Sequence, residues 1–321
     1  MLTRRHLRIK VMQAVYAHLS VEGQSLGQGE KKMVQSFQQL FDLFIYQLSF
    51  LIEVFDFAEL KIEEGKNKLL PTREDLDPNV LFIENRLIAK LRQNRDIKKH
   101  TERLRINWSD HQEIVRKVFQ EIKGGAIYQN FMAKKKSSFK EDRTLLLQLI
   151  KEYVADSEDL QYHYEEQNIF WDEDYFAANR LLINSIEGMM PDDDELTPLP
   201  GVFKDLDEDG KSEDRQFAID LFRKTVLKGA DFDDMIAGRA KNWEFERIAK
   251  VDIILIKMAL VELLYFPSIP IKVTINEYVE ISKYYSTPKS RIFINGILDN
   301  LVHEWMNEGK IQKIGRGLKE N

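Results

Sequence analysis

The sequence predicts an all-α protein, and three properties point to that fold class. Apolar residues recur at intervals of three and four, as at Val11, Val15 and Leu19, which is the spacing of one face of a helix. Only eight prolines occur among the 321 residues, and long stretches lack the polar and apolar alternation of a half-buried strand. Sequence signals that begin helices also recur along the chain. Together these properties favour helices throughout.

The predicted helices follow from these signals in order along the chain. Capping boxes begin helices at Ser138 and Thr274, because a hydroxyl and a nearby acid satisfy free amides at a helix start. Thr287 followed by Pro288 is typical of an N-cap and first helical residue, and Gly309 marks the end of that helix. The expected helices cover residues 3–21, 31–63, 78–94, 109–132, 139–165, 173–188, 213–227, 231–240, 244–265, 275–285 and 288–308.

Composition limits the class of protein. Hydrophobic residues make up 43% and charged residues 31% of the chain, which is typical of a soluble, helix-rich protein. Cysteine is absent, so disulfides and thiol chemistry are excluded. No apolar run is long enough for a membrane helix, and the N-terminus does not resemble a secretory signal. We therefore expect a cytoplasmic protein of two or three domains that does not enter a membrane.

An acidic segment divides the chain. Residues 191–214 contain ten acidic residues against Lys204 and Lys211, together with three prolines. Like charges repel and proline interrupts helices, so the segment is expected to be a solvated linker. An intramolecular mask over a basic RNA site is the alternative. Asp205–Gly210 resembles the start of a calcium loop, but Gln216 stands where a bidentate glutamate is needed, so no metal is predicted.

The sequence contains no recognisable catalytic motif. The glycines lack the arrangement of a phosphate-binding loop, and HExxH and GxSxG are missing. The six histidines lie far apart without the spacing of metal ligands. The formal net charge of −6 means that any nucleic-acid binding must come from a local basic patch. The sequence therefore predicts a binding protein rather than an enzyme, with no cofactor.

The first candidate RNA site is the N-terminal helix. Arg4, Arg5, Arg8 and Lys10 fall within two turns. The arginines are expected on one side, with Val11 beginning the buried face on another. Cations at a helix N-terminus oppose the helix dipole, which favours a functional reason for them, such as gripping phosphates. A solvated helix start is the alternative.

The second candidate RNA site is the segment before the last helix. Lys289, Arg291 and the hydroxyls of Thr287 and Ser290 surround a helix N-terminus, which favours anions. Phe293 could stack on an unpaired base, as in many single-stranded RNA complexes. A core position for Phe293 is the alternative, because apolar residues follow it at helical spacing.

These two segments, with the sequence near them, resemble the NusB family. The N-terminal part of the resemblance is Arg4-Arg5-x-x-Arg8 followed by Gln13-Ala14-Val15-Tyr16. The C-terminal part is more specific and consists of three blocks at 246–264, 269–284 and 290–299, which read ERIAKVDIILIKMALVELL, IPIKVTINEYVEISKY and SRIFINGILD.

The resemblance implies a core of two small helical bundles with an inserted helical module. Five segments follow from it. Residues 1–30 hold the first core helix, 31–190 the inserted region, 191–212 the acidic linker, 213–308 the rest of the core and 309–321 a tail. Chain segments at 98–105 and 134–136 in the insertion are basic. A second RNA contact there is one reading, and solvated helix faces are the other.

The resemblance also implies a function. The family binds single-stranded boxA RNA together with NusE, a small-subunit ribosomal protein, and joins the antitermination complex of RNA polymerase on ribosomal RNA transcripts. The NusE contact would include Tyr16 and Asp252. Lys289 stands where many members carry an acid, which should strengthen phosphate binding and reduce sequence discrimination. The RNA contact would use Arg4, Arg5, Arg8, Lys10, Lys289, Ser290, Arg291 and Phe293.

Two other functions would make different demands on the sequence. An RNA-modifying enzyme with a NusB-like domain would need an α/β domain with a glycine-rich loop, and residues 31–210 show neither strands nor such a loop. A non-catalytic adaptor in transcription or ribosome assembly would act through the insertion without binding RNA, so RNA affinity distinguishes it. The sequence leaves open whether the protein is a monomer or a homodimer that hides the arginine side.

Overall fold

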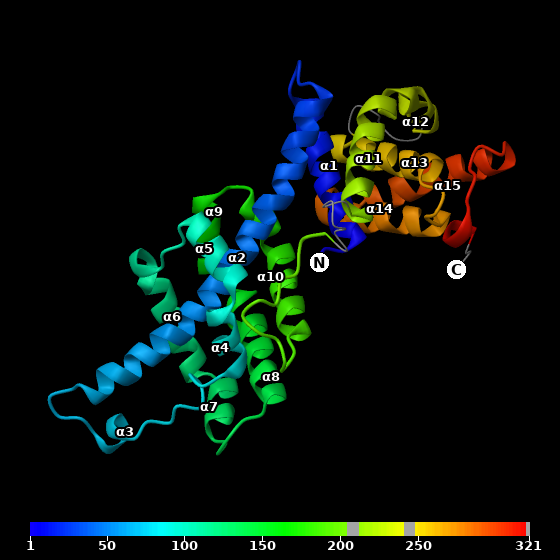
Figure 1. Cartoon of the computed structure of the whole chain (residues 1–321). Coiled ribbons are helices and arrows are strands. Elements are labelled where there is room, and N and C mark those ends of the chain that lie inside the picture. The colour runs from blue at the N-terminus through cyan, green and yellow to red at the C-terminus, as the bar shows by residue number, and fades with distance from the viewer. Residues whose placement is uncertain (204–211, 241–247, 319–321) are drawn as a thin grey trace. The chain divides into compact units, whose positions relative to one another are not determined.

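The computed structural model describes residues 1–203, 212–240 and 248–318, and all regular structure in those ranges is helical. The all-α prediction is therefore confirmed. The chain divides into two compact units. Their helices are labelled in Figure 1, where the colour runs from blue at the N-terminus to red at the C-terminus. Unit 1 comprises Met1 and Gln38–Val202, and unit 2 comprises Leu2–Phe37 and Phe203–Asn321. The two units are described separately below.

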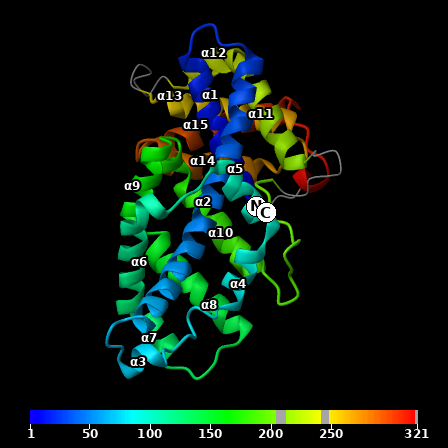
Figure 2. The ribbon, with the colours of Figure 1, turned by 60° about the vertical axis from the view of Figure 1, so that its left-hand side comes forward.

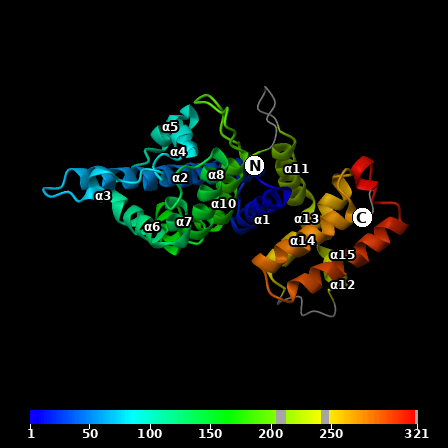
Figure 3. The same cartoon turned by 90° about the horizontal axis from the view of Figure 1, so that it is seen from below.

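Unit 2 is built around one apolar helix. Helix α13 (Lys250–Tyr265) is apolar on nearly all sides, which is typical of a helix buried among others. It packs against four long helices of the unit, which can be followed in Figure 3. These are α1 (Arg4–Ser20), α11 (Glu213–Lys228), α14 (Ile271–Tyr285) and α15 (Ser290–Asn307). The short α12 (Asp233–Arg239) and the first turns of α2 (Leu26–Lys66) complete the unit.

Unit 1 surrounds the rest of α2, which Figure 2 shows running along it. Its core is rich in aromatic rings. Phe55 and Phe82 stack at a centroid distance of 4.1 Å, and Tyr46 lies against Trp108 and Trp171. The other helices of the unit are α3 (Arg73–Leu76), α4 (Arg86–Gln93), α5 (Arg95–Leu104), α6 (Gln112–Gly124), α7 (Ala126–Met132), α8 (Phe139–Leu149), α9 (Glu158–Gln167) and α10 (Trp171–Gly188).

Two long helices predicted in unit 1 are interrupted. The predicted helix at 109–132 stops at Gly124 and resumes at Ala126, because Gly125 is extended and a β-carbon on it would lie 1.9 Å from the Tyr153 hydroxyl. The predicted helix at 139–165 passes through a π-helical turn and ends, and Ser157 then caps α9 by accepting a hydrogen bond from Leu160 N–H. The apolar spacing predicted continuous helices, but the extended Gly125 and the Ser157 cap divide them.

Helix α5 was missed, and α4 is shorter than expected. Asn85 caps α4 by accepting hydrogen bonds from the N–H groups of Leu87 and Ile88, so the helix begins there and not at residue 78. Asn94 ends α4 and also caps α5, accepting from Ile97 N–H at 3.0 Å. Asparagine at an N-cap is a strong start signal, and here one residue separates two helices.

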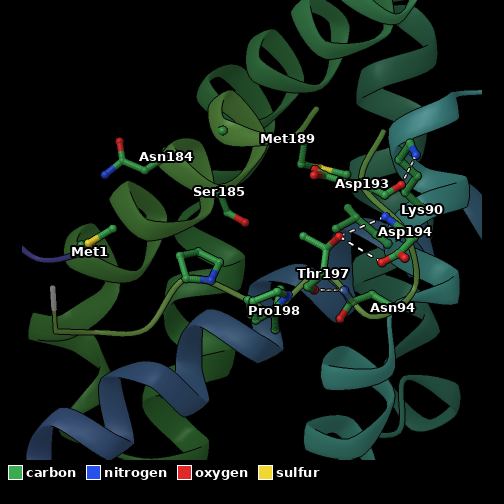
Figure 4. A pocket seen from close by; sticks show the side chains of 14 residues that line it. Met1, Lys90, Asn94, Asn184, Ser185, Met189, Asp193, Asp194, Thr197 and Pro198 are labelled. Atoms are coloured by element: carbon green, nitrogen blue, oxygen red, sulfur yellow. Dashed lines mark hydrogen bonds between the residues drawn. The ribbon is translucent and has the colours of Figure 1, made fainter. Parts of the chain in front are cut away.

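The acidic segment that begins at residue 191 was expected to be a solvated linker, but its first part, residues 191–200, is hydrogen-bonded along α4 and α5. The Asn94 side chain donates to Thr197 O at 2.7 Å, and Arg95 N–H donates to Glu195 O at 2.9 Å. Figure 4 shows the pocket of about 440 Å³ formed there, with Lys90 also bonded to the Asp193 carbonyl. The polar side chains of this pocket thus hold the segment in place, and cationic partners compensate its charge.

Some predictions lie outside the described residues. The calcium-like Asp205–Gly210 sequence falls in 204–211. The predicted helix start at 244–247 and the Glu246-Arg247 part of the family resemblance fall in 241–247. Helix α13 is described from Lys250 onward.

Candidate nucleic-acid interface

A capping box fixes the start of α1. Thr3 has an extended backbone, its hydroxyl accepts a hydrogen bond from His6 N–H at 3.4 Å, and the His6 ring lies 2.8 Å from the same hydroxyl. Such reciprocal bonds set the direction in which the chain enters a helix. Arg4 and Arg5 therefore project from a well-defined first turn.

Arg8 lies inside unit 2, which corrects the expectation that it shares the exposed side with Arg4 and Arg5. Only 2% of the residue is exposed. Its guanidinium donates two hydrogen bonds to the Glu262 carboxylate, at 2.8 and 2.7 Å. The physical reason is its spacing: Arg8 precedes Val11 by three residues and Val15 by seven, so it continues the buried face of α1.

Glu262 is the centre of this buried network. Besides the two bonds from Arg8, its carboxylate accepts hydrogen bonds from the hydroxyls of Thr274 at 2.8 Å and Tyr278 at 3.0 Å. Burial acts to lower the pKa of Arg8, but the charge and hydrogen bonds of Glu262 outweigh it and raise that pKa. Burial, followed by the charge of Glu262, raises the pKa of Tyr278 well above its usual value. The network joins α1, α13 and α14 through a fully bonded charge pair.

Arg5 is held at the edge of this network. Its guanidinium donates to the two oxygens of Glu277 at 3.0 and 2.7 Å, and its side chain remains 41% exposed. Glu277 also lies 3.7 Å from the Arg8 guanidinium. The hydrogen bond from Glu277 is the main reason that the pKa of Arg5 is raised, and Glu280 and Tyr284 add to it. A bidentate carboxylate thus orients an exposed arginine.

Arg4 is held in a similar way by α11. Its Nε donates to Asp214 at 2.8 Å, and its guanidinium lies 4.7 Å from the centre of the Phe217 ring. Its side chain is as exposed as that of Arg5. Cation–π contact and a carboxylate therefore orient Arg4 without burying it.

The second predicted RNA segment splits into buried and exposed residues. Ser290 donates a hydrogen bond to the Asp252 carboxylate at 2.6 Å, and both residues are buried. Phe293 is buried as well, which bears out the alternative of a core position. Lys10 is also buried, although it was predicted to face RNA. The helical spacing of these residues places them on inward faces.

The exposed part of this region lies on the turn from α14 to α15. Lys289 and Arg291 are exposed, and so is Ile292 in the first turn of α15. Tyr284, near the end of α14, is 78% exposed. Glu277, Glu280 and Tyr284 recur at helical spacing, so one stripe of α14 leads from Arg5 towards this turn.

The two residues expected to contact NusE differ in accessibility. Tyr16 is exposed, with the Lys250 ammonium 4.9 Å from the centre of its ring. Lys250 also donates to the Ser20 hydroxyl at 2.9 Å. Asp252 is buried and is engaged with Ser290. The structure therefore leaves Tyr16 available to a partner and gives Asp252 a supporting position.

Replacing Ser290 by alanine is expected to destabilise unit 2 by about 1–3 kcal/mol, because the buried Asp252 carboxylate loses its donor. Thermal unfolding monitored by circular dichroism measures the effect. Thr287→Ala is the matched control, since the Thr287 side chain is exposed and its hydroxyl lies 2.9 Å from the Ser290 hydroxyl rather than against the buried carboxylate. Equal losses for the two variants would contradict a supporting role for the Ser290 to Asp252 bond.

Three important residues were missed in the sequence. Glu262 is the one acid within the apolar stretch 253–264, and an isolated acid in such a helix signals a buried partner. Glu277 and Tyr284 gave no comparable signal, because charged and aromatic residues are ordinary on a half-exposed helix. Their importance depends on α14 lying against α1, which the sequence does not display.

Two further properties of the described ranges concern metals and membranes. Within residues 1–203, 212–240 and 248–318, no three histidine or acidic side chains are grouped to hold a metal ion. In the same ranges, no helix combines the length and apolar character needed to cross a bilayer.

Comparison with known proteins gives a consistent result. A family model described as the NusB family matches residues 176–303. The transcription antitermination protein NusB of Salinibacter ruber is 44% identical over 113 residues, which are 35% of this chain and 69% of that protein. Its counterpart in Geobacter sulfurreducens is 40% identical over 115 residues, 36% of this chain and 83% of that protein.

A third relative shows a similar level of identity. The transcription antitermination protein NusB of Chloroherpeton thalassium is 42% identical over 115 residues, which are 36% of this chain and 54% of that protein. No solved structure matches the chain. The similarity thus covers about a third of the chain, and most of unit 1 lies outside the residues that the family model matches.

Proposed function

The chain belongs to the NusB family, and on that premise we propose that it is a non-catalytic, RNA-binding transcription antitermination factor. In this proposal it binds boxA-type single-stranded RNA together with NusE. The complex then joins the antitermination complex of RNA polymerase in the cytoplasm and supports ribosomal RNA transcription. The relatives named above are described as transcription antitermination proteins.

One observation carries the RNA part of the proposal: cationic side chains and an exposed aromatic ring lie on neighbouring helices of unit 2, namely α1, α14 and the start of α15. We call these residues the basic face, and they are Arg4, Arg5, Tyr284, Lys289 and Arg291. Two carboxylates orient the arginines while leaving about 40% of each side chain exposed. The cationic side chains would bind RNA phosphates, and an unpaired base would stack on the tyrosine ring.

The buried residues have indirect roles in this proposal. Arg8 and Glu262 hold α1 against α13 and α14, and so fix where Arg5 lies. Ser290 and Asp252 hold the turn that carries Lys289. A site held by a second layer of hydrogen bonds keeps its geometry better than a loop does.

We further propose that unit 2 is the family core and unit 1 an inserted module. The module would include residues 190–200, since they are bonded to α4 and α5. Tyr16, supported by Lys250, would be part of the NusE contact. The basic segment at 134–136 lies in unit 1 and provides a control for the experiment that follows.

The test is RNA binding by the full chain, with and without NusE, to a boxA-like single strand and to a scrambled strand across a salt series. For Arg5→Ala/Lys289→Ala we expect affinity to fall about tenfold or more. Removing two phosphate contacts should also reduce the slope of log K against log salt by about 1.4, taking about 0.7 for each contact. Tyr284→Ala should lower affinity with little change in slope, because stacking carries no charge.

Lys135→Ala/Lys136→Ala is the matched control. It removes the same charge from exposed positions in unit 1, and its affinity should stay within about twofold of the parent chain. An equal loss in this control would move the RNA contact to the insertion. Absence of selective binding even with NusE would favour a non-catalytic adaptor that works through unit 1.

A further inference from the structure

Unit 1 exposes large apolar side chains on α9, on the turn after it and on α10. These residues are 62–72% exposed, and we call them the aromatic face: Tyr162, Ile169, Phe170 and Phe176. Two of the exposed rings have a buried aromatic neighbour in sequence: Trp171 follows Phe170, and Tyr175 precedes Phe176. The core therefore takes one ring of each pair and leaves the other in solvent.

The aromatic face is held in place by hydrogen bonds. The Asn168 side chain accepts from Phe170 N–H at 3.1 Å, and the Asn168 carbonyl accepts from Trp171 N–H at 2.8 Å. The Trp171 ring donates to Gln39 O at 3.0 Å. Gln161 on α9 donates to Asp172 on α10 at 2.5 Å. The turn that carries Ile169 and Phe170 is thus anchored at several points, which lowers the entropy lost when a partner binds.

The charge around the aromatic face is predominantly negative, although Arg180 is exposed on α10 one turn after Phe176. Residues 152–179 contain nine acids and neither lysine nor arginine. Lys117 reaches in from α6 to pair with Asp159. Among the described residues, Glu158, Glu165 and Glu166 form no ion pair with a lysine or arginine, and Glu166 instead accepts from the Tyr162 hydroxyl, which raises the pKa of that tyrosine. An apolar face rimmed by carboxylates complements a cationic partner.

We propose that the aromatic face of α9 and α10 binds a basic polypeptide segment of a partner protein. Arginine suits both parts of such a surface, because its guanidinium stacks on aromatic rings and pairs with carboxylates. The aliphatic part of its side chain would cover Ile169. RNA fits poorly, since its phosphates would meet the carboxylates. The role is separate from RNA binding by the basic face of unit 2.

The test uses the full chain and a fluorescent twelve-residue peptide in which arginine and leucine alternate with glycine. Fluorescence anisotropy at about 150 mM salt gives its affinity, at an ionic strength that screens exposed charges beyond roughly 8 Å. For Phe170→Ser/Phe176→Ser we expect at least a tenfold loss. Leu69→Ser/Leu70→Ser removes two apolar side chains from the loop after α2 that are even more exposed, at 98% and 85%, and we expect less than a twofold change.

A charge pair of variants completes the test. Glu165→Gln/Glu166→Gln should weaken the peptide about fivefold or more, whereas Glu63→Gln/Glu74→Gln, at exposed positions elsewhere in unit 1, should have less than half that effect. Equal losses in test and control variants would overturn the proposal, because they would reduce binding to net charge. Self-association in sedimentation that disappears with Phe170→Ser/Phe176→Ser, or RNA binding sensitive to that change, would also overturn it.

Discussion

Arg8→Ala is expected to destabilise unit 2 by about 3–5 kcal/mol. Removing one partner of a buried ion pair leaves the other charge without compensation, which costs far more than the pair contributes when intact. Here the stranded group would be Glu262, whose two oxygens would keep only the hydroxyls of Thr274 and Tyr278. Native-state hydrogen exchange of amides in α13 and α14 measures the loss in this unit.

Two controls separate the buried pair from the charge itself. Arg5→Ala removes an exposed arginine with the same bidentate geometry, and we expect a loss below about 1 kcal/mol. Arg8→Met/Glu262→Gln removes both charges, and the amide keeps an acceptor for one of the two hydroxyls of Thr274 and Tyr278 and offers a donor to the other, so most of the stability should return. If Arg8→Ala cost no more than Arg5→Ala, the network would have no role in joining these helices.

RNA binding by the same variants distinguishes a supporting role of Arg8 from a direct contact with RNA. If Arg8 acts only by fixing α1, the Arg8→Met/Glu262→Gln chain should fold and retain most of its affinity. A direct phosphate contact by Arg8 would instead appear as a lost salt-dependent contact in a stable protein. The two readings of Arg8 are thereby distinguishable.

Local signals in the sequence were sufficient for most helices of unit 2. Thr287, Gly309 and the apolar spacing of α13 predict helix ends within a few residues, because caps and periodicity act over one or two turns. The same signals failed at Gly125. Only glycine fits at position 125, because a β-carbon there would collide with the Tyr153 hydroxyl. Tyr153 is distant in sequence, so no local pattern reveals that contact.

The candidate site was predictable only in part, for a related reason. Arg4, Arg5, Lys289 and Arg291 were identified from charge, and they are at least partly exposed. Arg8 was misplaced because its partner, Glu262, lies 254 residues away. A charge at an inward position is stable only if such a partner exists, so burial could not be decided from α1 alone.

Trp171→Ala is expected to destabilise unit 1 by about 3–5 kcal/mol, since it removes a buried ring and leaves a cavity. The ring is 6% exposed, packs 5.0 Å from the centre of Tyr46 and donates to Gln39 O. Hydrogen exchange should accelerate most in α10 and in α2 beyond Gln38. A larger effect in α13 than in α10 would contradict the division into two units.

Phe170→Ala is the matched control, because it removes a neighbouring aromatic ring that is 64% exposed. Its effect on stability should lie within about 0.5 kcal/mol. The pair of variants thereby separates two roles of adjacent rings. Trp171 would hold the turn between α9 and α10, and Phe170 would be displayed by it. A stable Phe170→Ala chain with weakened peptide binding fits a ring kept exposed for a partner, whereas a destabilised one would make Phe170 part of the core.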